Sequence, residues 1–150
     1  MQERKGGLQA RQDYRVCQEM KARRFDHIDL RVNKIEPARH FYARLLPELG
    51  FTLHSSGEEW FIWQAPGSGP VEFFGFTESR GHQPNDNRIA FWAEDRAEVD
   101  RLGEIVKNAG GQNLEGPGLW REYSPGYYAL LFEDPSGNKL EICSRETRSG

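Results

Sequence analysis

FDHIDLRV, residues 25–32, and RIAFWAED, residues 88–95, are the two stretches of sequence that decide the fold. In the first stretch Ile28, Leu30 and Val32 alternate with polar side chains, which is typical of a strand with one buried face. We therefore expect a strand that packs its aliphatic face on a helix and turns its polar face, with His27 and Asp29, away from that helix.

The same order of elements follows both stretches. Apolar residues recur at helical spacing between 38 and 49 and again between 99 and 109. Gly50 and Gly110 are placed to end these helices, and Asp95 with Glu98 forms a carboxylate version of the capping box. Three short strands are predicted after each helix, over residues 51–54, 60–64 and 70–77, and over residues 112–114, 127–132 and 139–143.

The chain is thus predicted to hold two copies of a strand–helix–strand–strand–strand unit. The first-strand positions 27 and 88 are 61 residues apart, and the last-strand positions 72 and 141 are 69 residues apart. A small sheet cannot bury both of its faces within one half, so we expect the halves to combine into one large curved mixed sheet. The expected class is α+β.

Composition excludes several classes of protein. The 150 residues are 37% hydrophobic and 12% aromatic, which is too apolar for intrinsic disorder. The formal net charge of -3 argues against nucleic acid as a partner, and no apolar run is long enough to span a membrane. Two cysteines, Cys17 and Cys143, are too few for a disulfide framework, so a cytoplasmic location is expected.

The expected organisation is a single domain over residues 25–145, with modules at 25–78 and 87–145. A basic extension, residues 1–24, precedes this domain, and residues 146–150 form a C-terminal tail. The extension is expected to be solvated, or to form at most a short helix near residues 14–22.

Several stretches together resemble the vicinal oxygen chelate superfamily, which includes glyoxalase I, extradiol dioxygenases and the fosfomycin- and bleomycin-resistance proteins. They are FDHIDLRV, HFYARLLPELGF (residues 40–51), VEFFGF (residues 71–76), RIAFWAED and EDPSGNKLEI (residues 133–142). The resemblance implies tandem βαβββ modules around a cleft in which a divalent metal holds substrate oxygens.

The resemblance also implies four metal-ligand positions. His27 matches on the first strand of module one, Glu72 on its last strand, and Glu141 on the last strand of module two. The remaining position, normally His, is occupied by Arg88, whose guanidinium has no lone pair to give to a metal. An iron site of two histidines and one carboxylate is therefore incomplete in this chain.

Three arrangements of this site remain open. Arg88 pairs with Glu72 and Glu141 in a metal-free cluster, or His27, Glu72 and Glu141 bind Fe, Mn, Ni or Zn, or His82 turns inward and completes a rearranged site. In the metal-dependent arrangements Glu72 and Glu141 are also the candidate catalytic carboxylates.

Aromatic residues concentrate in the predicted strands and supply candidate substrate-binding groups. Phe74, Trp92 and Tyr128 are expected to line the cleft beside Arg88. Trp120 and Arg121 lie in a Gly/Pro-rich insert of module two that is placed to cover the cleft.

Two function classes are consistent with these residues. The first is a metal-dependent lyase, isomerase or dioxygenase-type enzyme acting on a small molecule. The second is a metal-free protein of the bleomycin-resistance type that sequesters a flat ligand between aromatic side chains. The resemblance further implies a homodimer.

Overall fold

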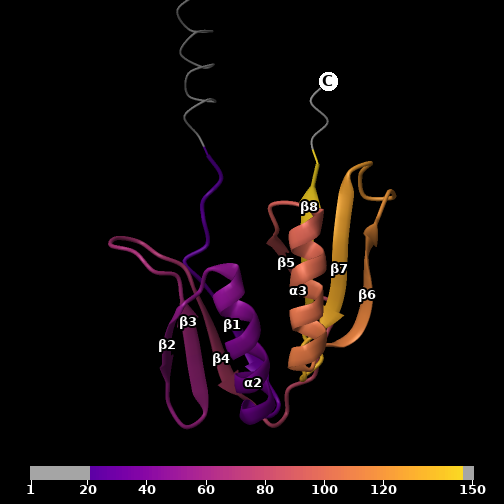
Figure 1. Ribbon diagram of the computed structural model, residues 1–150. Coiled ribbons are helices and arrows are strands. Elements are labelled where there is room, and N and C mark those ends of the chain that lie inside the picture. Colours follow the sequence, from indigo (N-terminus) through magenta and orange to yellow (C-terminus); the bar gives the residue numbers. More distant parts are fainter. Residues whose placement is uncertain (1–20, 147–150) are drawn as a thin grey trace, which may run out of the picture.

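Two βαβββ units follow one another in the computed structural model, which describes residues 21–146 (Figure 1). The first comprises β1 (His27–Val32), α2 (Ile35–Leu45), the 3-10 helix η1 (Leu46–Leu49), β2 (Leu53–Ser56), β3 (Trp60–Gln64) and β4 (Phe73–Glu78). The second comprises β5 (Arg88–Trp92), α3 (Arg96–Ala109), β6 (Gln112–Leu119), β7 (Tyr127–Glu133) and β8 (Lys139–Arg145). The predicted α+β class and the tandem units are confirmed. The short helix predicted near residues 14–22 lies almost wholly outside the described residues.

The strands form two four-stranded mixed sheets, where the sequence predicted a single sheet. Their orders are β1-β4-β3-β2 and β5-β8-β7-β6, and in each sheet the first and last strands of the unit pair in parallel. The edge strands β1 and β5 are not hydrogen-bonded to each other. The halves combine through side-chain packing instead of through backbone pairing.

Helices α2 and α3 lie side by side and carry one hydrophobic core shared by both sheets (Figure 1). Phe41 and Leu45 of α2 and Leu102 and Val106 of α3 are fully buried in it. In each helix the two residues are four positions apart, a spacing that keeps them on the same inward-facing side of the helix. This is why the amphipathic pattern in the sequence located both helices. None of the helices in residues 21–146 is long and apolar enough to cross a bilayer.

The helix ends follow the sequence signals. Asp95 accepts a hydrogen bond from the backbone N–H of Glu98 at 2.8 Å, so the N-cap half of the predicted capping box is present. Glu98 in turn accepts a hydrogen bond from the N–H of Glu94, the residue before the N-cap, at 2.7 Å. Gly50 and Gly110 end their helices with φ of 94° and 103°, a left-handed conformation that glycine adopts without a Cβ penalty.

The DPSGN turn, residues 134–138, fastens the second unit to the first. Asp134 is fully buried and accepts hydrogen bonds from the Tyr42 hydroxyl of α2 at 2.6 Å and from the backbone N–H of Ser136 at 2.8 Å. The hydroxyl of Ser136 in turn donates to the side chain of Asn33 at 2.8 Å. This turn therefore fixes how the two sheets are placed around the helices.

Candidate functional site

Each sheet has one face on the helices and one face turned away from them, which we call its open face. On the first sheet, strand register places these neighbouring pairs on the open face: His27 and Phe73, Asp29 and Gly75, Arg31 and Thr77. The corresponding pairs on the second sheet are Arg88 and Lys139, Ala90 and Glu141, Trp92 and Cys143.

His27 is held in place on the open face of the first sheet by an aromatic ring and two carboxylates. Its ring stacks on Phe73 with centroids 4.6 Å apart and planes 7° from parallel. Its Nδ1 lies 2.8 Å from Asp26 Oδ1, and its Nε2 lies 3.5 Å from Asp29 Oδ2. The hydrogen bond to Asp26, with added attraction from Asp29, raises the pKa of His27 above its ordinary value. A protonated imidazole is therefore stabilised here.

Asp29 and Glu141 occupy corresponding rungs on different strands. Asp29 lies opposite Gly75, whereas Glu141 lies opposite Ala90, so the first sheet carries its carboxylate on β1 and the second sheet carries it on β8. A Cβ on Gly75 would collide with Oδ1 of Asp29. Sequence reasoning did not select Asp29 as a site residue, although the alternation along β1 had placed it beside His27.

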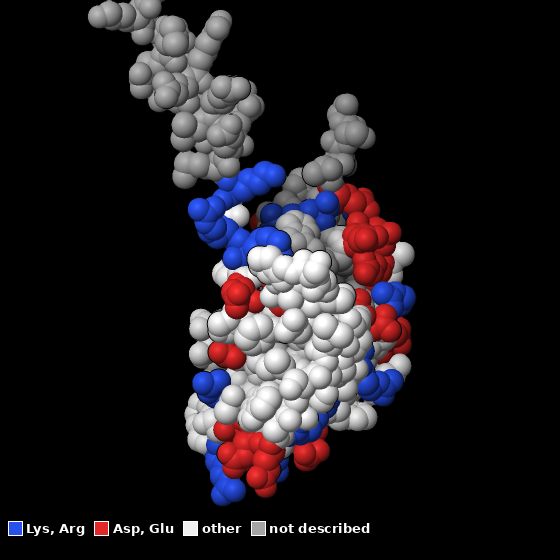
Figure 2. Space-filling view, turned by 90° about the vertical axis from the view of Figure 1, so that its left-hand side faces the viewer, with Lys and Arg blue, Asp and Glu red and all other residues white. Residues whose placement is uncertain are grey.

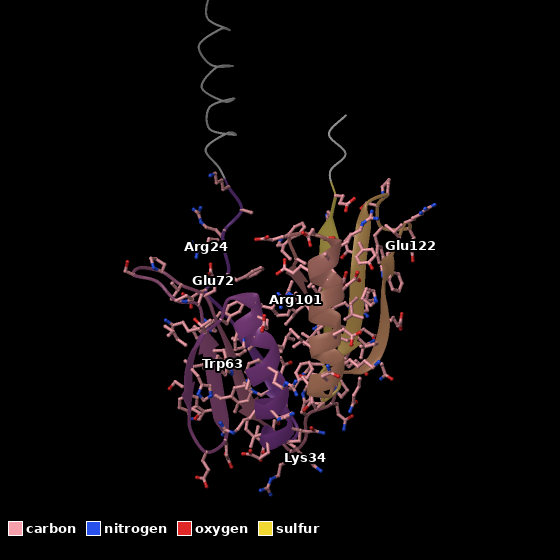
Figure 3. All side chains as sticks on the ribbon, viewed as in Figure 1. Arg24, Lys34, Trp63, Glu72, Arg101 and Glu122 are labelled. Atoms are coloured by element: carbon pink, nitrogen blue, oxygen red, sulfur yellow. The ribbon has the colours of Figure 1, made fainter. Side chains whose placement is uncertain are left out.

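Glu72 lies just before β4, one residue out of step with the open-face positions Phe73 and Gly75. Its carboxylate pairs with the guanidinium of Arg24, and this hydrogen bond lowers the pKa of Glu72. Figure 3 shows Arg24 and Glu72 at the same end of the first unit. The side chain of Glu72 is thus held by the segment that leads into β1.

Glu141 is buried on the open face of the second sheet, where the hydroxyl of Tyr127 donates a hydrogen bond to its carboxylate. Burial is the main cause of the raised pKa of Tyr127, and the hydrogen bond to Glu141 adds to it. Tyr127, Cys143 and the partly buried Trp120 belong to a small apolar cluster around this carboxylate.

A cleft of about 590 Å³ opens between β1, β4 and β5. It brings together five of the residues selected from the sequence: His27, Glu72, Phe74, Arg88 and Trp92. Further aromatic side chains, among them Phe25 and Phe91, complete its walls. The cleft is therefore aromatic and carries both basic side chains, Arg24 and Arg88, and acidic ones, Asp26 and Glu72.

Arg88 does not form the ion pair that the metal-free cluster required. Glu72 is bound by Arg24 and Glu141 by Tyr127. Among residues 21–146, no carboxylate lies within ion-pair distance of the Arg88 guanidinium. The predicted pairing of Arg88 with Glu72 or Glu141 is wrong for the single chain, because neither carboxylate reaches it.

The other selected residues do not line this cleft. Tyr128 faces α3, where its hydroxyl donates to Asp100 at 2.6 Å and the Arg96 guanidinium lies 5.4 Å from its ring centre. Trp120 packs in the cluster around Glu141 and donates from Nε1 to the carbonyl oxygen of Ala129 at 3.2 Å. Arg121 lies exposed in the turn before β7. His82 lines a different cavity.

The donor set of a single chain does not fit the metal that the resemblance implied. In the part of the chain that the structure describes, no three His, Cys, Asp or Glu side chains converge as a metal site would require. His27 and Glu141 belong to different sheets, and Glu72 is engaged by Arg24.

Comparison with known proteins places the chain in a family. The model of the Glyoxalase/Bleomycin resistance protein/Dioxygenase superfamily matches residues 24–142. The chain belongs to this superfamily, and the resemblance noted in the sequence is confirmed.

Individual relatives agree with this assignment. The uncharacterized protein YqjT of Bacillus subtilis (strain 168) is 30% identical over 131 residues, covering 77% of this chain and 94% of the relative. The crystal structure of a glyoxalase/bleomycin resistance protein from Albidiferax ferrireducens T118 has a TM-score of 0.65 at 25% identity, covering 81% of this chain and 98% of that one. FosX, a fosfomycin resistance protein of Listeria monocytogenes, shares the fold, with a TM-score of 0.64 at 16% identity over 84% of this chain and 96% of FosX.

Proposed function

We propose that the protein binds a small organic anion in the cleft between β1, β4 and β5, and that this binding requires no metal ion. The observation that carries the proposal is Arg88. Its guanidinium borders the cleft and has no carboxylate partner among residues 21–146. A guanidinium offers paired donors that match the two oxygens of a carboxylate or a phosphonate.

The walls of the cleft favour a flat apolar body on that anion. Trp92 and Phe25 are 70% and 76% exposed, so most of their aromatic surface is free to cover a ligand. Phe73 and Phe91 contribute to the same lining. A volume of about 590 Å³ lies within the range usual for small-molecule sites. The ligand class is thus an aromatic or otherwise planar acid.

The second candidate is a metal-dependent enzyme of lyase, isomerase or dioxygenase type. The observation that favours it is that His27 and Asp29 share an open face and that Glu141 occupies the rung corresponding to Asp29. An imidazole and carboxylates from two chains could together bind a divalent metal, which would act as a Lewis acid on substrate oxygens. In this version Glu141 or Glu72 serves as the base.

We further propose a homodimer in which the open face of each first sheet lies against the open face of the other chain's second sheet. Both faces expose large apolar side chains: Leu53 and Trp60 on the first sheet, and Trp92 on the second. Figure 2 shows the side of β2 and β3 as a broad surface with few charged residues. A twofold axis would cover both open faces at once. Light scattering that gives the mass of a single chain at high concentration would contradict the homodimer.

The anion proposal is tested with benzoate and phenylphosphonate as probes, by calorimetry and by the fluorescence change of the tryptophans. Arg88→Gln should weaken binding about tenfold or more, since it removes a charge-assisted hydrogen bond. Arg80→Gln is the matched control, because Arg80 is an exposed arginine outside the cleft. Absence of binding of both probes at millimolar concentration, or equal affinity of the two variants, would contradict the proposal.

Metal analysis separates the two candidates. Protein purified without chelator should hold no stoichiometric divalent metal, and added EDTA should leave probe binding unchanged. A stoichiometric metal that probe binding needs would favour the enzyme. Arg88→His then provides an independent check, because it restores the ligand type of the superfamily at this position and should create affinity for Mn or Zn.

A further inference from the structure

A second cavity, of about 300 Å³, lies between the two units beside the linker, residues 79–87, that joins β4 to β5. Its walls come from β1, from residues 82–87 of the linker, and from the beginnings of β5 and β8. The cleft and this cavity share a single lining residue, Ile89. The second cavity is therefore a separate site, and both units contribute to its walls.

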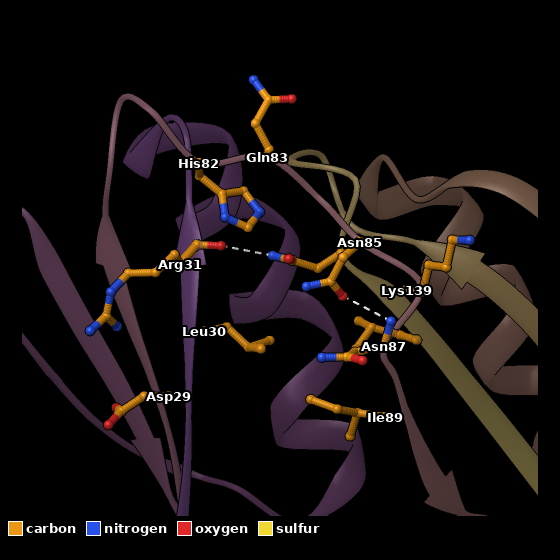
Figure 4. Close-up of a pocket in the computed structure, with 11 residues that line it drawn as sticks. Asp29, Leu30, Arg31, His82, Gln83, Asn85, Asn87, Ile89 and Lys139 are labelled. Carbon is orange, nitrogen blue, oxygen red and sulfur yellow. Dashed lines mark hydrogen bonds between the residues drawn. The ribbon is translucent and has the colours of Figure 1, made fainter.

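The floor of the cavity is apolar. Leu30, Ile89 and Leu140 line it, and Figure 4 shows the side chains of Leu30 and Ile89 pointing toward one another across the space. An apolar floor of this kind can pack against the flat face of a ring, which has no hydrogen-bonding groups to satisfy.

The opposite side of the cavity carries free hydrogen-bonding groups. The Nε2 atom of His82 is buried and has no hydrogen-bond partner in the described part of the chain, and Figure 4 shows the ring of His82 directed into the space. A buried polar atom without a partner is unfavourable unless something in the cavity satisfies it. The side chain of Asn87 lies across from it and offers both a donor and an acceptor.

The charged residues around this cavity are directed elsewhere. Figure 4 shows the side chains of Asp29 and Arg31 on the far side of β1, pointing away from the space. Lys139 forms an ion pair with Asp86 at 2.7 Å. A ligand here would meet amide and imidazole groups and no uncompensated charge, which disfavours an anion.

We propose that this cavity binds a neutral planar heterocycle that carries adjacent hydrogen-bond donors and acceptors, of the nucleobase type. The apolar floor would cover the ring, and His82 and Asn87 would bond to its edge. A side-chain amide can pair with two neighbouring groups on the edge of adenine, which makes Asn87 suited to this role. The volume limits the ligand to one or two fused rings.

The experiment measures binding of free adenine and cytosine to the full chain by calorimetry and by the NMR signals of His82. His82→Phe keeps a ring of similar size and removes Nε2, and Asn87→Leu keeps the volume and removes the amide. Each is expected to weaken binding of the preferred base about five- to tenfold, as for loss of one or two hydrogen bonds.

Gln83→Leu is the matched control, because Gln83 borders the same cavity while its side chain points outward in Figure 4, and it should leave the affinity unchanged. Indole, a flat ring without an acceptor, should bind more weakly than adenine. Failure of both bases to bind at millimolar concentration, or a crystal soaked with adenine that shows water alone at His82, would overturn the proposal. Equal affinity of all three variants would overturn it as well. Benzoate binding in the cleft is independent of each of these results.

Discussion

The carboxylate of Asp29 occupies the space into which a side chain on Gly75 would project. The two residues are opposite one another on β1 and β4, and the corresponding pair of the second sheet is Ala90 with Glu141. In each sheet a residue with little or no side chain faces one carboxylate. The duplicated units thus each keep one acid at this rung and place it on different strands.

Gly75→Ala should therefore displace the carboxylate of Asp29 from His27. Because the Asp29 side chain is half exposed, it can turn toward solvent, and the free energy of unfolding should change by less than about 0.5 kcal/mol. The pKa of His27 should fall toward its ordinary value, as followed by NMR titration. Gly81→Ala is the control, since a Cβ there meets no atom within 4 Å. An unchanged His27 pKa in Gly75→Ala would contradict this account.

Asp26→Asn should lower the pKa of His27 further than Gly75→Ala does, because the hydrogen bond to Asp26 is the largest cause of the raised pKa. A raised pKa means that protonated His27 stabilises the fold at pH below its unfolded pKa of about 6.5, and that this contribution is lost as pH rises through the folded pKa. NMR titration of both variants measures how far the pKa of His27 falls in each. A larger fall in Gly75→Ala than in Asp26→Asn would show that Asp29, and not Asp26, is the main cause of the raised pKa.

The fold was predictable from the sequence because alternation and helical spacing report burial directly. Ile28, Leu30 and Val32 pack toward the helices as their pattern indicated, and Asp95 caps α3. The number of sheets was not predictable, since alternation shows which face of β1 is buried and says nothing of whether its edge pairs with β5.

The site was predictable only in part. His27, Arg88 and Trp92 were selected from the sequence and do border one cleft. The resemblance of VEFFGF to the last strand of a unit aligned Glu72 with Glu141. In the structure the residue of β4 at the rung that corresponds to Glu141 is Gly75, which lies opposite Asp29 of β1. A shift of an odd number of residues along a strand moves a side chain to the other face of the sheet. The local motif alone therefore could not show which residue of β4 lies on the open face.

Tyr127→Phe should destabilise the protein by about 1–3 kcal/mol, because it leaves the buried carboxylate of Glu141 without the hydroxyl that donates to it. Urea unfolding measures the change. Tyr123→Phe is the matched control within the same aromatic group, since Tyr123 is largely exposed, and it should cost less than about 0.5 kcal/mol. Equal stability of the two variants would show that the Tyr127 hydroxyl does not matter to Glu141.

Tyr42→Phe should cost about 1.5–3 kcal/mol, because the Tyr42 hydroxyl donates to a fully buried carboxylate that joins the two units. The control is Tyr128→Phe, which removes a hydrogen bond of the same 2.6 Å length to the exposed Asp100 and should have a much smaller effect. Thermal and urea unfolding compare the two. A smaller loss in Tyr42→Phe than in Tyr128→Phe would contradict the role given to the DPSGN turn.

The same pair predicts the response to alkaline pH. Burial, and then the charge of Asp134, raise the pKa of Tyr42 well above its ordinary value. The unfolded chain therefore loses the Tyr42 proton near pH 10 while the folded protein keeps it, so stability falls as pH rises above about 10. In Tyr42→Phe this loss is absent, and the difference in unfolding free energy between wild type and variant should shrink from about pH 8 to about pH 11. Urea unfolding at both pH values measures this difference, and a difference that stays constant would show that the folded state does not hold the Tyr42 proton.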